Sequence, residues 1–364
     1  RRRIIEVVIE DDGKDTPETF KKGDPKDLSR EEIVENLLES GIWPVIHQRP
    51  YDIIASPKDV PRDIFISGFD TAPLAPDLDY IMKDTEKEFQ AGIDALARLT
   101  DGKIHIGLDA RYPSAKAFTR ANNVVRHEFR GPHPAGNVGI QIHHIKPINK
   151  GEIVWTLKPQ DVVTIGNLFL TGKYDPSVIV ALTGSEVEKP VYYKMIRGAE
   201  IAPMIKDNLR QEHVRYISGN VLTGHTLTKE GYVGFSDSQV TVIPEGDHHE
   251  LFGWIMPGFK KFSVSRSFPS WIMPGKEYRL DTNLHGGRRA YVMTGEYEKV
   301  LPMDIYPVQL IKSIMIDDID RMEQLGIYEV IEEDLALCEF VCTSKTKVQS
   351  ILRSGLDNLR KELE

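Results

Sequence analysis

The spacing of apolar residues over the first half of the chain alternates between short strand-like runs and longer helical ones. Ser29 can cap a first amphipathic helix, which Gly41 ends. A clearer helix is expected over 81–99, because Phe89, Ile93 and Leu96 share one face. Short buried strands are expected at 63–68, 103–108 and 123–129. Strands and helices that alternate with short connections predict a parallel α/β layer.

The pattern changes twice in the second half of the chain. A helix that is apolar nearly all round is expected over 160–171, followed by core strands at 177–182 and 191–196. From about residue 198, short strands with glycine-rich turns suggest a small β-rich domain, at 214–224, 232–235 and 239–243. Helices are expected over about 304–325 and 333–361. The last one places Leu352, Leu356 and Leu359 on one face, for packing or docking.

The first residues do not fit this scheme. Residues 4–9 form a strand-like run that opens the sequence, and a polar stretch follows it. We interpret the run as the end of a domain that this sequence lacks, and the polar stretch as a linker. The predicted divisions are therefore 1–21, 22–197, 198–262 and 263–364.

Composition restricts the possible partners. The chain has 364 residues, of which 40 % are apolar and 28 % charged, with a net charge of −9 and no basic tract. Nucleic acid is therefore not an expected partner. No run of about 18 apolar residues exists, so we expect no membrane-spanning segment. Two cysteines cannot form a disulfide framework.

The stretch 131–148 is the most distinctive in the chain. Pro132 and Pro134 exclude a helix at its start, and a short helix can follow from Ala135. Gly136 and Gly139 fall in the first turn of that helix, where the absence of Cβ atoms admits either an anion or closely packed protein. Both interpretations stay open.

No metal site is expected in the three histidine-bearing or cysteine-bearing segments. His143 and His144 are adjacent, so on a helix they point about 100° apart, and His133 lies before the helix. The segment 247–250 (Asp-His-His-Glu) is interpreted as an exposed turn. Cys338 and Cys342 are interpreted as buried, inert thiols.

Other candidate chemistry is sparse. Arg288 and Arg289 follow two glycines and could bind a phosphate or carboxylate, or pair with neighbouring acids. No nucleophile elbow, Walker loop or G-x-G-x-x-G motif is present, and we identify no complete catalytic constellation.

Several strings together are more specific than any one motif. They are Gly131-Pro-His-Pro-Ala-Gly136, Gly166-Asn-Leu-Phe-Leu-Thr-Gly172, Ile217-Ser-Gly-Asn-Val-Leu-Thr-Gly224, Glu250-Leu-Phe-Gly-Trp-Ile-Met-Pro-Gly258, Leu301-Pro-Met-Asp304 and Glu333-Asp-Leu-Ala-Leu-Cys-Glu-Phe-Val-Cys342. Over essentially its whole length the chain resembles the A subunit of the bacterial sodium-translocating NADH:quinone reductase. That family is related to the flavin-bearing, NADH-oxidising subunit of respiratory complex I and to one of the subunits of the Rnf complex.

The resemblance implies a fold of the α/β plus α+β class. It implies a remnant of a biotin-carrier-like domain and linker at 1–21 and a Rossmann-like layer at 22–197. A β-grasp-like, soluble-ligand-binding domain would occupy 198–262 and a helical region 263–364. It also implies a peripheral accessory subunit on the cytoplasmic face of the bacterial inner membrane, with the membrane subunits of the complex as partners. The complex couples NADH oxidation and quinone reduction to sodium transport, whereas the isolated chain is not expected to be catalytic.

Departures from the relatives imply that this chain binds neither FMN nor an iron–sulfur cluster. The flavin-holding Gly-Arg-Gly-Gly loop of the complex I relative corresponds to 40–45 here, where Trp43 and Pro44 would occupy the space of a flavin phosphate. The C-x-x-C-x-x-C cluster motif is reduced to Cys338 and Cys342. Thr343 and Ser344 replace the Pro-Gly that usually follows Cys342, although Lys345 is kept.

The family has also been associated with quinone binding, which needs an apolar, aromatic cleft with one or two donors. Ligands of parallel α/β layers bind outside the carboxyl ends of the strands, where the loops at 40–50, 69–76 and 131–139 should converge. The candidate cleft residues are Trp43, His47, Arg49, Phe69, His133, Gly136 and Gly139. The same residues could instead pack the cleft shut. The alternative function is a soluble nucleotide-binding enzyme or binder that uses the Gly131–Gly139 loop.

Overall fold

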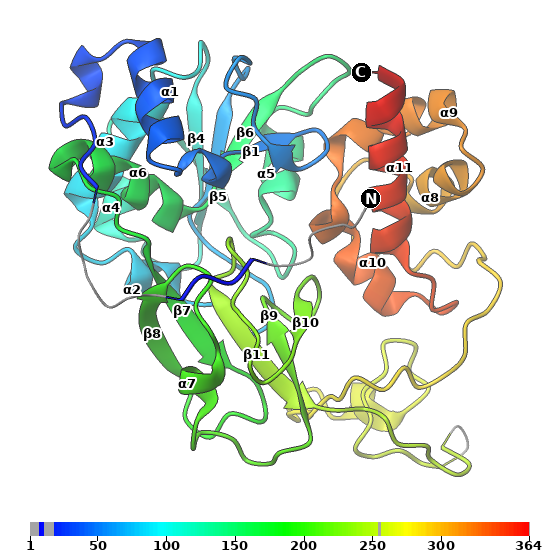
Figure 1. The fold of residues 1–364 in the computed structure, drawn as a ribbon. Coiled ribbons are helices and arrows are strands. Elements are labelled where there is room, and N and C mark those ends of the chain that lie inside the picture. The colour runs from blue at the N-terminus through cyan, green and yellow to red at the C-terminus, as the bar shows by residue number, and fades with distance from the viewer. Residues whose placement is uncertain (1–6, 11–17, 254–255, 364) are drawn as a thin grey trace.

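The computed structural model describes residues 7–10, 18–253 and 256–363. The strand expected over 4–9 lies largely outside the described residues, and residues 7–9 form no strand. The described chain contains two β-sheets, with the helices of the N-terminal half around the first sheet and a separate group of helices at the C-terminus (Figure 1).

The first sheet has six strands in the order β2-β1-β6-β3-β4-β5. Their bounds are β1 His47–Arg49, β2 Ile53–Ile54, β3 Ile64–Ser67, β4 Ile104–Asp109, β5 Val124–Phe129 and β6 Val154–Leu157. The four strands β6, β3, β4 and β5 run parallel, and β1 and β2 add an antiparallel edge. The expected parallel α/β layer is therefore present. The direction of strand order reverses between β3 and β6, which makes that point the switch point of the sheet.

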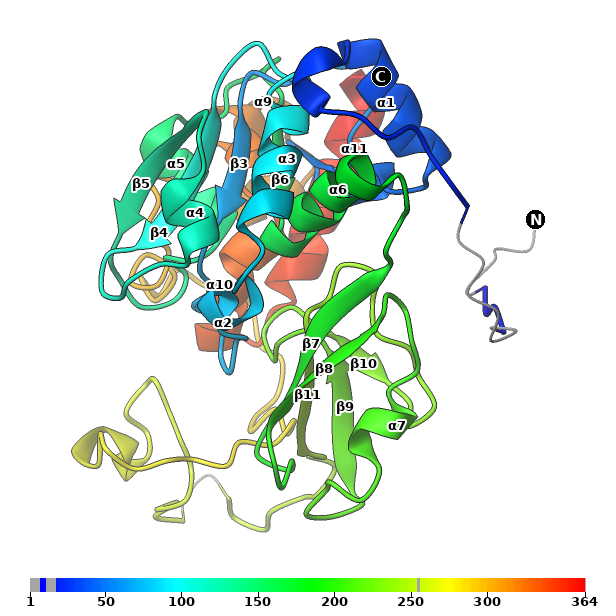
Figure 2. The same ribbon diagram turned by 90° about the vertical axis from the view of Figure 1, so that its left-hand side faces the viewer.

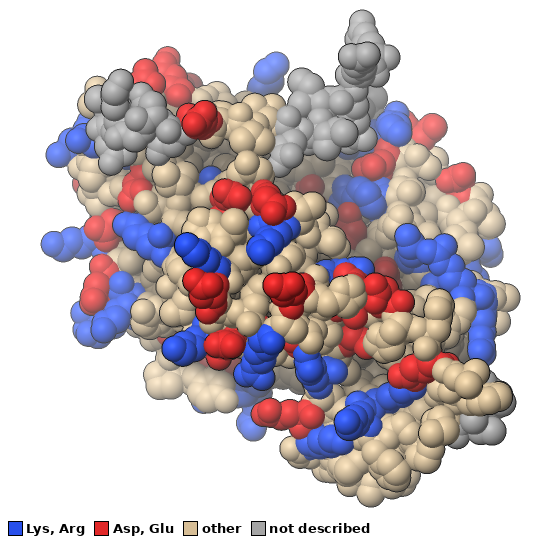
Figure 3. All heavy atoms as spheres, turned by 60° about the horizontal axis from the view of Figure 1, so that its bottom comes forward, with Lys and Arg blue, Asp and Glu red and all other residues tan. Residues whose placement is uncertain are grey.

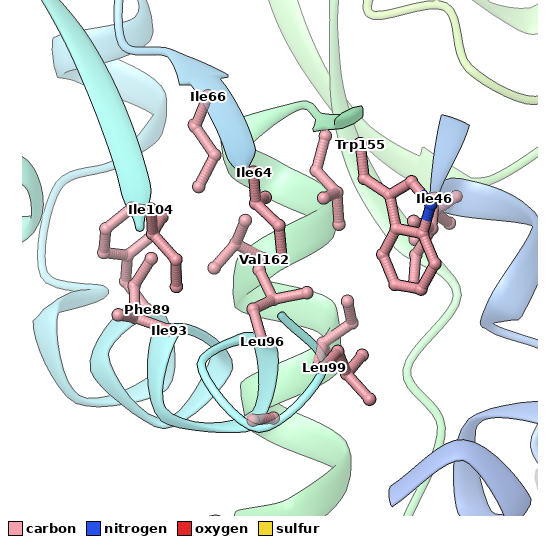
Figure 4. Packing of buried hydrophobic residues seen from close by; sticks show 14 of the residues in the cluster. Ile46, Ile64, Ile66, Phe89, Ile93, Leu96, Leu99, Ile104, Trp155 and Val162 are labelled. Carbon is pink, nitrogen blue, oxygen red and sulfur yellow. The ribbon is translucent and has the colours of Figure 1, made fainter. Parts of the chain in front are cut away.

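Two helices, α3 (Glu86–Leu96) and α6 (Pro159–Thr171), cover one face of this sheet side by side (Figure 2). The apolar face predicted for 81–99 is confirmed: Phe89, Ile93 and Leu96 are fully buried. They pack against Val162 of α6 and the strand residues of the sheet (Figure 4). Burial of such aliphatic and aromatic side chains stabilises the layer by roughly 1.5–3 kcal/mol for each.

The helices at the start of the chain and beside α3 are short. They are η1 (Pro25–Asp27), α1 (Arg30–Glu39), η2 (Trp43–Val45), α2 (Leu78–Ile81) and α4 (Lys116–Arg120). Ser29 caps α1 as expected: its hydroxyl accepts a hydrogen bond from the Glu32 amide, and the Glu32 carboxylate accepts one from the Ser29 amide. On the other face of the sheet, α5 (Val138–Ile145) covers β3.

The second sheet has five strands in the order β10-β9-β11-β7-β8. Their bounds are β7 Ser177–Thr183, β8 Val191–Ile196, β9 Val214–Ser218, β10 His225–Leu227 and β11 Gln239–Pro244, with α7 (Ala202–Ile205) between β8 and β9. We expected β7 and β8 in the first layer, and this was wrong. β7 pairs with β11 in parallel and with β8 antiparallel, so the boundary between the sheets falls between Thr171 and Ser177 rather than near 197.

The C-terminal region is helical only from residue 307. It contains α8 (Pro307–Met315), α9 (Ile319–Gln324), η4 (Ile327–Glu329), η5 (Glu332–Leu335), α10 (Ala336–Val341) and α11 (Val348–Leu363). Leu352, Leu356 and Leu359 of α11 are completely buried in the core that this region shares with β3 and α5. The apolar face of the last helix is therefore used for packing within the chain rather than for docking.

Between β11 and α8 the chain follows an irregular path over about sixty residues. Among its described residues only η3 (Pro269–Ile272) is helical, and no strand forms. This segment extends away from both sheets at the lower right of Figure 1. A helical region beginning at 263, as we expected, is therefore not what the structure shows.

Candidate functional site

A cavity of about 330 Å³ lies at the switch point of the first sheet, where that sheet meets the second one. Ser67 at the end of β3 and Thr156 and Leu157 at the end of β6 form part of its wall. The second sheet and the segment Ile331–Glu333 close the opposite side. Its volume is in the range of small-molecule sites, and it lies where ligands bind in open α/β sheets.

Five of the seven predicted cleft residues line this cavity: His47, Arg49, Phe69, His133 and Gly136. Loops far apart in the sequence therefore converge at the carboxyl ends of the strands. Apolar side chains complete the wall: Val45, Leu78, Val138, Leu157, Val178 and Ile331.

Trp43 and Gly139 do not line the cavity. Trp43 is 3 % exposed, packs edge to face on Trp155 with ring centroids 5.6 Å apart, and donates its indole hydrogen to the Ala55 carbonyl at 2.7 Å. The tryptophan thus fills the core beneath the sheet and does not line the cavity, although we had expected it among the cleft residues. A Cβ atom on Gly139 would lie 2.3 Å from Nη1 of Arg49 and 2.4 Å from Asp334, so that glycine serves close packing.

His133 lies in the cavity wall and contacts Thr71. Oγ1 of Thr71 lies 3.1 Å from its Nδ1 and also accepts a hydrogen bond from the Gly136 amide at 2.9 Å. The Thr71 hydroxyl therefore links the His133 ring to the Gly136 amide. Burial lowers the pKa of His133, so the ring is neutral at pH 7.

His47 is held differently. Its Nδ1 lies 2.9 Å from Oδ1 of Asp52, which also lines the cavity. The pKa of Asp52 is lowered although burial opposes this, because the hydrogen bond from His47 and the charges of His47 and Arg49 stabilise its carboxylate. This pair gives the cavity an ionised carboxylate beside an imidazole.

Arg49 forms the most buried charged group of the site. It is 1 % exposed, and its guanidinium donates to Asp334 at 2.8 Å and to Glu333 at 2.6 Å. Asn137 at the start of α5 donates to the Glu333 carbonyl at 3.1 Å. The C-terminal segment 331–335 is therefore fixed against the wall of the cavity by the first domain.

Three amides of the Gly131–Gly139 loop already have acceptors within the chain. The amides of Ala135, Gly136 and Asn137 donate to Pro132, Thr71 Oγ1 and Pro134 respectively. Backbone amides that already have acceptors cannot form the cradle that a phosphate needs. Of the two interpretations of this loop, the contacts favour tight packing.

Residues of the second sheet and of α6 also form the cavity, and sequence reasoning missed them. Asp161 of α6 and Arg197 form an ion pair in which both side chains are 6 % exposed, and Lys158 donates to the Ser236 carbonyl at 2.6 Å. Asn220 and Thr223 belong to the Ile217–Gly224 string, which we singled out for its resemblance alone. These residues reach the cavity only because the second sheet lies beside the first one.

The remaining candidates lie elsewhere. Arg288 and Arg289 are exposed and do not line the cavity. The Arg289 amide donates to the Ser344 carbonyl at 3.0 Å. His143 lies 2.7 Å from Glu329, and His144 lies 2.9 Å from the Pro302 carbonyl. Within the described part of the chain, no three His, Cys, Asp or Glu residues are placed to hold a metal ion.

A wider hollow of about 620 Å³ opens on the surface beside α3 and η1. It is bordered by charged surface residues such as Lys22, Glu86 and Arg120, and it is remote from the switch point. We therefore take the cavity between the sheets as the candidate site.

Fold and site together define an α/β protein with a ligand-sized cavity between a Rossmann-like layer and a second β-sheet. The model of the family described as "NqrA second alpha/beta domain" matches residues 28–174, and the "NQRA C-terminal domain" matches residues 179–229. The chain is 39 % identical to the A subunit of the Na(+)-translocating NADH-quinone reductase of Neisseria meningitidis serogroup B over 368 residues, covering all of this chain and 81 % of that protein. Proteins of the same name from Yersinia pestis and Rhodopirellula baltica are also 39 % identical, with 81 % and 80 % of their lengths covered.

The chain belongs to the NqrA family, the A subunits of the Na+-translocating NADH-quinone reductase. The resemblance deduced from the sequence strings is thereby confirmed, as is membership in an oxidoreductase and translocase complex with further subunits. No helix among the described residues is long and apolar enough to cross a membrane. A solved NAD+-reducing NiFe-hydrogenase is similar with a TM-score of 0.45 and 12 % identity, over 60 % of this chain and 48 % of that one, and supports no further argument.

Proposed function

We propose that this chain is the peripheral, cytoplasmic-side accessory subunit of a Na+-pumping NADH:quinone reductase, and that its cavity binds the quinone head group. Family membership supports the first part. The second rests on one observation: His133, whose lowered pKa keeps its ring neutral at pH 7, lines a ligand-sized cavity together with Phe69. A quinone carbonyl accepts a hydrogen bond from an imidazole N–H, and an aromatic ring packs against the flat quinone ring.

Apolar residues along the cavity wall provide a surface for the rest of the molecule. Val45, Leu157 and Val178 are buried around the cavity and Leu78 is half-buried. The soluble nucleotide-binder remains the alternative, but the occupied amides of 135–137 disfavour it. Electrons for the quinone would come from redox centres of other subunits, where NADH and flavins react.

We also propose that this chain itself carries no flavin and no iron–sulfur cluster. A cluster needs about four ligands, whereas this sequence has two cysteines. Both are buried, and Cys342 accepts a hydrogen bond from the Thr346 amide at 3.3 Å. The absorbance spectrum of the purified chain tests this directly, because a yellow or brown protein would contradict it.

The quinone proposal is tested by adding short-chain ubiquinone to the purified chain and measuring saturation transfer by NMR. Ala72 lines the cavity, so Ala72→Phe should fill it and abolish the transfer. Ala110→Phe is the matched control, because Ala110 is exposed and outside the cavity. Equal transfer in both variants would reject the cavity as the site.

The accessory role needs a separate measurement. Membranes from a bacterium that lacks NqrA should regain Na+-stimulated NADH:quinone activity when this chain is supplied. No restoration, with the chain folded and the other subunits present, would contradict the accessory role.

A further inference from the structure

The irregular segment 256–293, which we call the strap, exposes large apolar side chains. Phe259, Trp271, Ile272 and Met293 are each between 57 % and 63 % exposed, and Met256 and Val292 are also more than half exposed. A soluble monomer rarely exposes so many large apolar groups in one short stretch. The strap therefore has the composition of a contact surface.

The strap is also basic, on an acidic protein. It contains seven Lys or Arg and two Asp or Glu residues, a net charge of +5; because the whole chain carries −9, the remainder carries −14. Figure 3 shows this end of the molecule, where blue cationic side chains lie beside broad uncharged areas. Lys260, Arg266 and Arg288 have no ion-pair partner among the described residues.

The strap is organised by its own hydrogen bonds. Ser263 and Ser270 bond to each other, and the Ser263 hydroxyl accepts from the Phe268 amide at 3.0 Å. Arg279 forms an ion pair with Glu186 beside the second sheet. At the other end, the Ser344 hydroxyl donates to the Ala290 carbonyl at 2.8 Å. These contacts fix which side chains are turned inward and leave Phe259 and Trp271 outward.

The arrangement of the apolar groups favours a deformable, anionic occupant. They are dispersed over about forty residues and line neither of the two cavities, whereas protein interfaces concentrate binding in packed central pockets. Tryptophan and other large apolar side chains interleaved with Lys and Arg are typical of segments that lie in the headgroup region of a membrane. A backbone without strands or long helices can remain hydrated there, although it could not enter the hydrocarbon.

We propose that the strap binds the anionic surface of a phospholipid bilayer and so sets the membrane-facing side of this chain. The inference deepens the proposed function, because it rests on the chain working at a membrane. The charge contrast adds direction: an anionic bilayer attracts the +5 strap and repels the acidic remainder, so only one orientation brings the apolar side chains to the lipid.

The test is flotation of the purified 364-residue chain with vesicles of phosphatidylcholine and phosphatidylglycerol in a three-to-one ratio. We expect binding to these vesicles, weaker binding in high salt, and none to pure phosphatidylcholine. Each cation near an anionic surface contributes roughly fivefold in affinity, so Lys260→Gln/Arg266→Gln/Arg288→Gln should bind roughly a hundredfold more weakly. Trp271→Ser/Ile272→Ser should lose at least roughly tenfold.

Matched controls exclude a general charge or hydrophobicity effect. Lys83→Gln/Lys87→Gln/Lys116→Gln removes the same charge from exposed positions near α2, α3 and α4, and Leu38→Ser removes an exposed leucine from α1. Both should bind vesicles like the unaltered chain. Equal losses in control and strap variants would overturn the proposal.

A protein partner would give a different result. The unaltered chain would then not float with anionic vesicles, and the strap variants would fail to bind membranes that lack NqrA. This combination would mean that the strap contacts a membrane-embedded protein of the complex and that the lipid proposal is wrong. Vesicle binding uses the chain alone, so its failure leaves the accessory role intact. Conversely, the unaltered chain could float with vesicles and still fail to restore activity to membranes that lack NqrA. That result would reject the accessory role and leave the lipid proposal standing.

Discussion

Arg49 and Asp334 are 285 residues apart in sequence, and their side chains form an ion pair 2.8 Å long in which neither is more than 1 % exposed. Arg49 ends β1 of the first sheet, and Asp334 lies in η5 of the C-terminal region. One carboxylate oxygen of Asp334 also accepts the Ile331 amide. The pair therefore joins two regions of the chain directly behind the cavity.

Removing Arg49 should strongly destabilise the protein. Arg49→Met leaves Asp334 buried without a counter-charge, which typically costs about 3–5 kcal/mol. Chemical unfolding monitored by tryptophan fluorescence measures the loss. Arg111→Met is the control, because Arg111 pairs with Asp109 at the surface and its removal should leave the unfolding midpoint nearly unchanged.

A double variant distinguishes a lost charge pair from lost packing. Arg49→Met/Asp334→Leu removes both fully buried charges and leaves only the partly exposed Glu333 without its partner, so most of the stability should return. If the double variant were as unstable as Arg49→Met, packing of the guanidinium rather than charge compensation would hold the two regions together.

Gly139 and Gly275 provide a matched pair of glycine substitutions. Gly139→Ala should destabilise by about 1–3 kcal/mol, because its Cβ would lie 2.3 Å from Nη1 of Arg49. Gly275→Ala meets no atom within 4 Å and should be neutral. Thermal unfolding of both variants tests this, and equal stability would refute the packing role assigned to Gly139.

Local patterns predicted most elements of the first layer and their parallel arrangement, but not where the layer ends. The apolar face of α3 and the cap of α1 depend on neighbours within a few residues, so the sequence displays them. The four residues of β6, in contrast, are all buried and too few to show a period, and no strand was predicted there. β7 and β8 were recognised as strands, but hydrogen bonds to β11, about sixty residues away, decide their sheet.

Similar reasons limited the prediction of the site. Topology alone placed His133, Phe69 and His47 at one end of the parallel strands. It could not show that Trp43 turns into the core toward Trp155, because both sides of that loop are apolar. Nor could it show that Glu333 closes the cavity, since this contact joins segments 284 residues apart.

Glu333 should make stability depend on pH. Burial, with the nearby charges of Asp334 and Asp52, raises its pKa from 4.5 to about 7, although Arg49 opposes this. Between these two values the folded chain retains a proton that the unfolded chain loses, so this group lowers stability as the pH rises from 4.5 to about 7. Above about 7 its effect is constant.

Glu333→Gln should remove this dependence. The Glu333 side chain is 36 % exposed, so solvent screening reduces the effect. We expect the free energy of unfolding of the variant, relative to that of the unaltered chain, to rise by about 1–2 kcal/mol from about pH 4.5 to about pH 8. Urea unfolding at both pH values measures it. Glu128→Gln, at an exposed position on β5, should show no such gain. An unchanged difference at the two pH values would mean that Glu333 is ionised throughout.

His133 should contribute directly to quinone affinity. His133→Phe keeps an aromatic ring but removes the ring nitrogens, and loss of one hydrogen bond weakens binding by roughly tenfold. Because burial lowers the pKa of His133 below its ordinary value of 6.5, protonation of the ring should not reduce the affinity at any pH above 6.5. Titration of short-chain ubiquinone at several pH values tests both statements.

His144→Phe is the control, since His144 is exposed and bonds to the Pro302 carbonyl away from the cavity. Unaltered affinity in His133→Phe would show that this imidazole packs the cavity wall and does not bind the carbonyl, while affinity that fell already above pH 6.5 would contradict the lowered pKa.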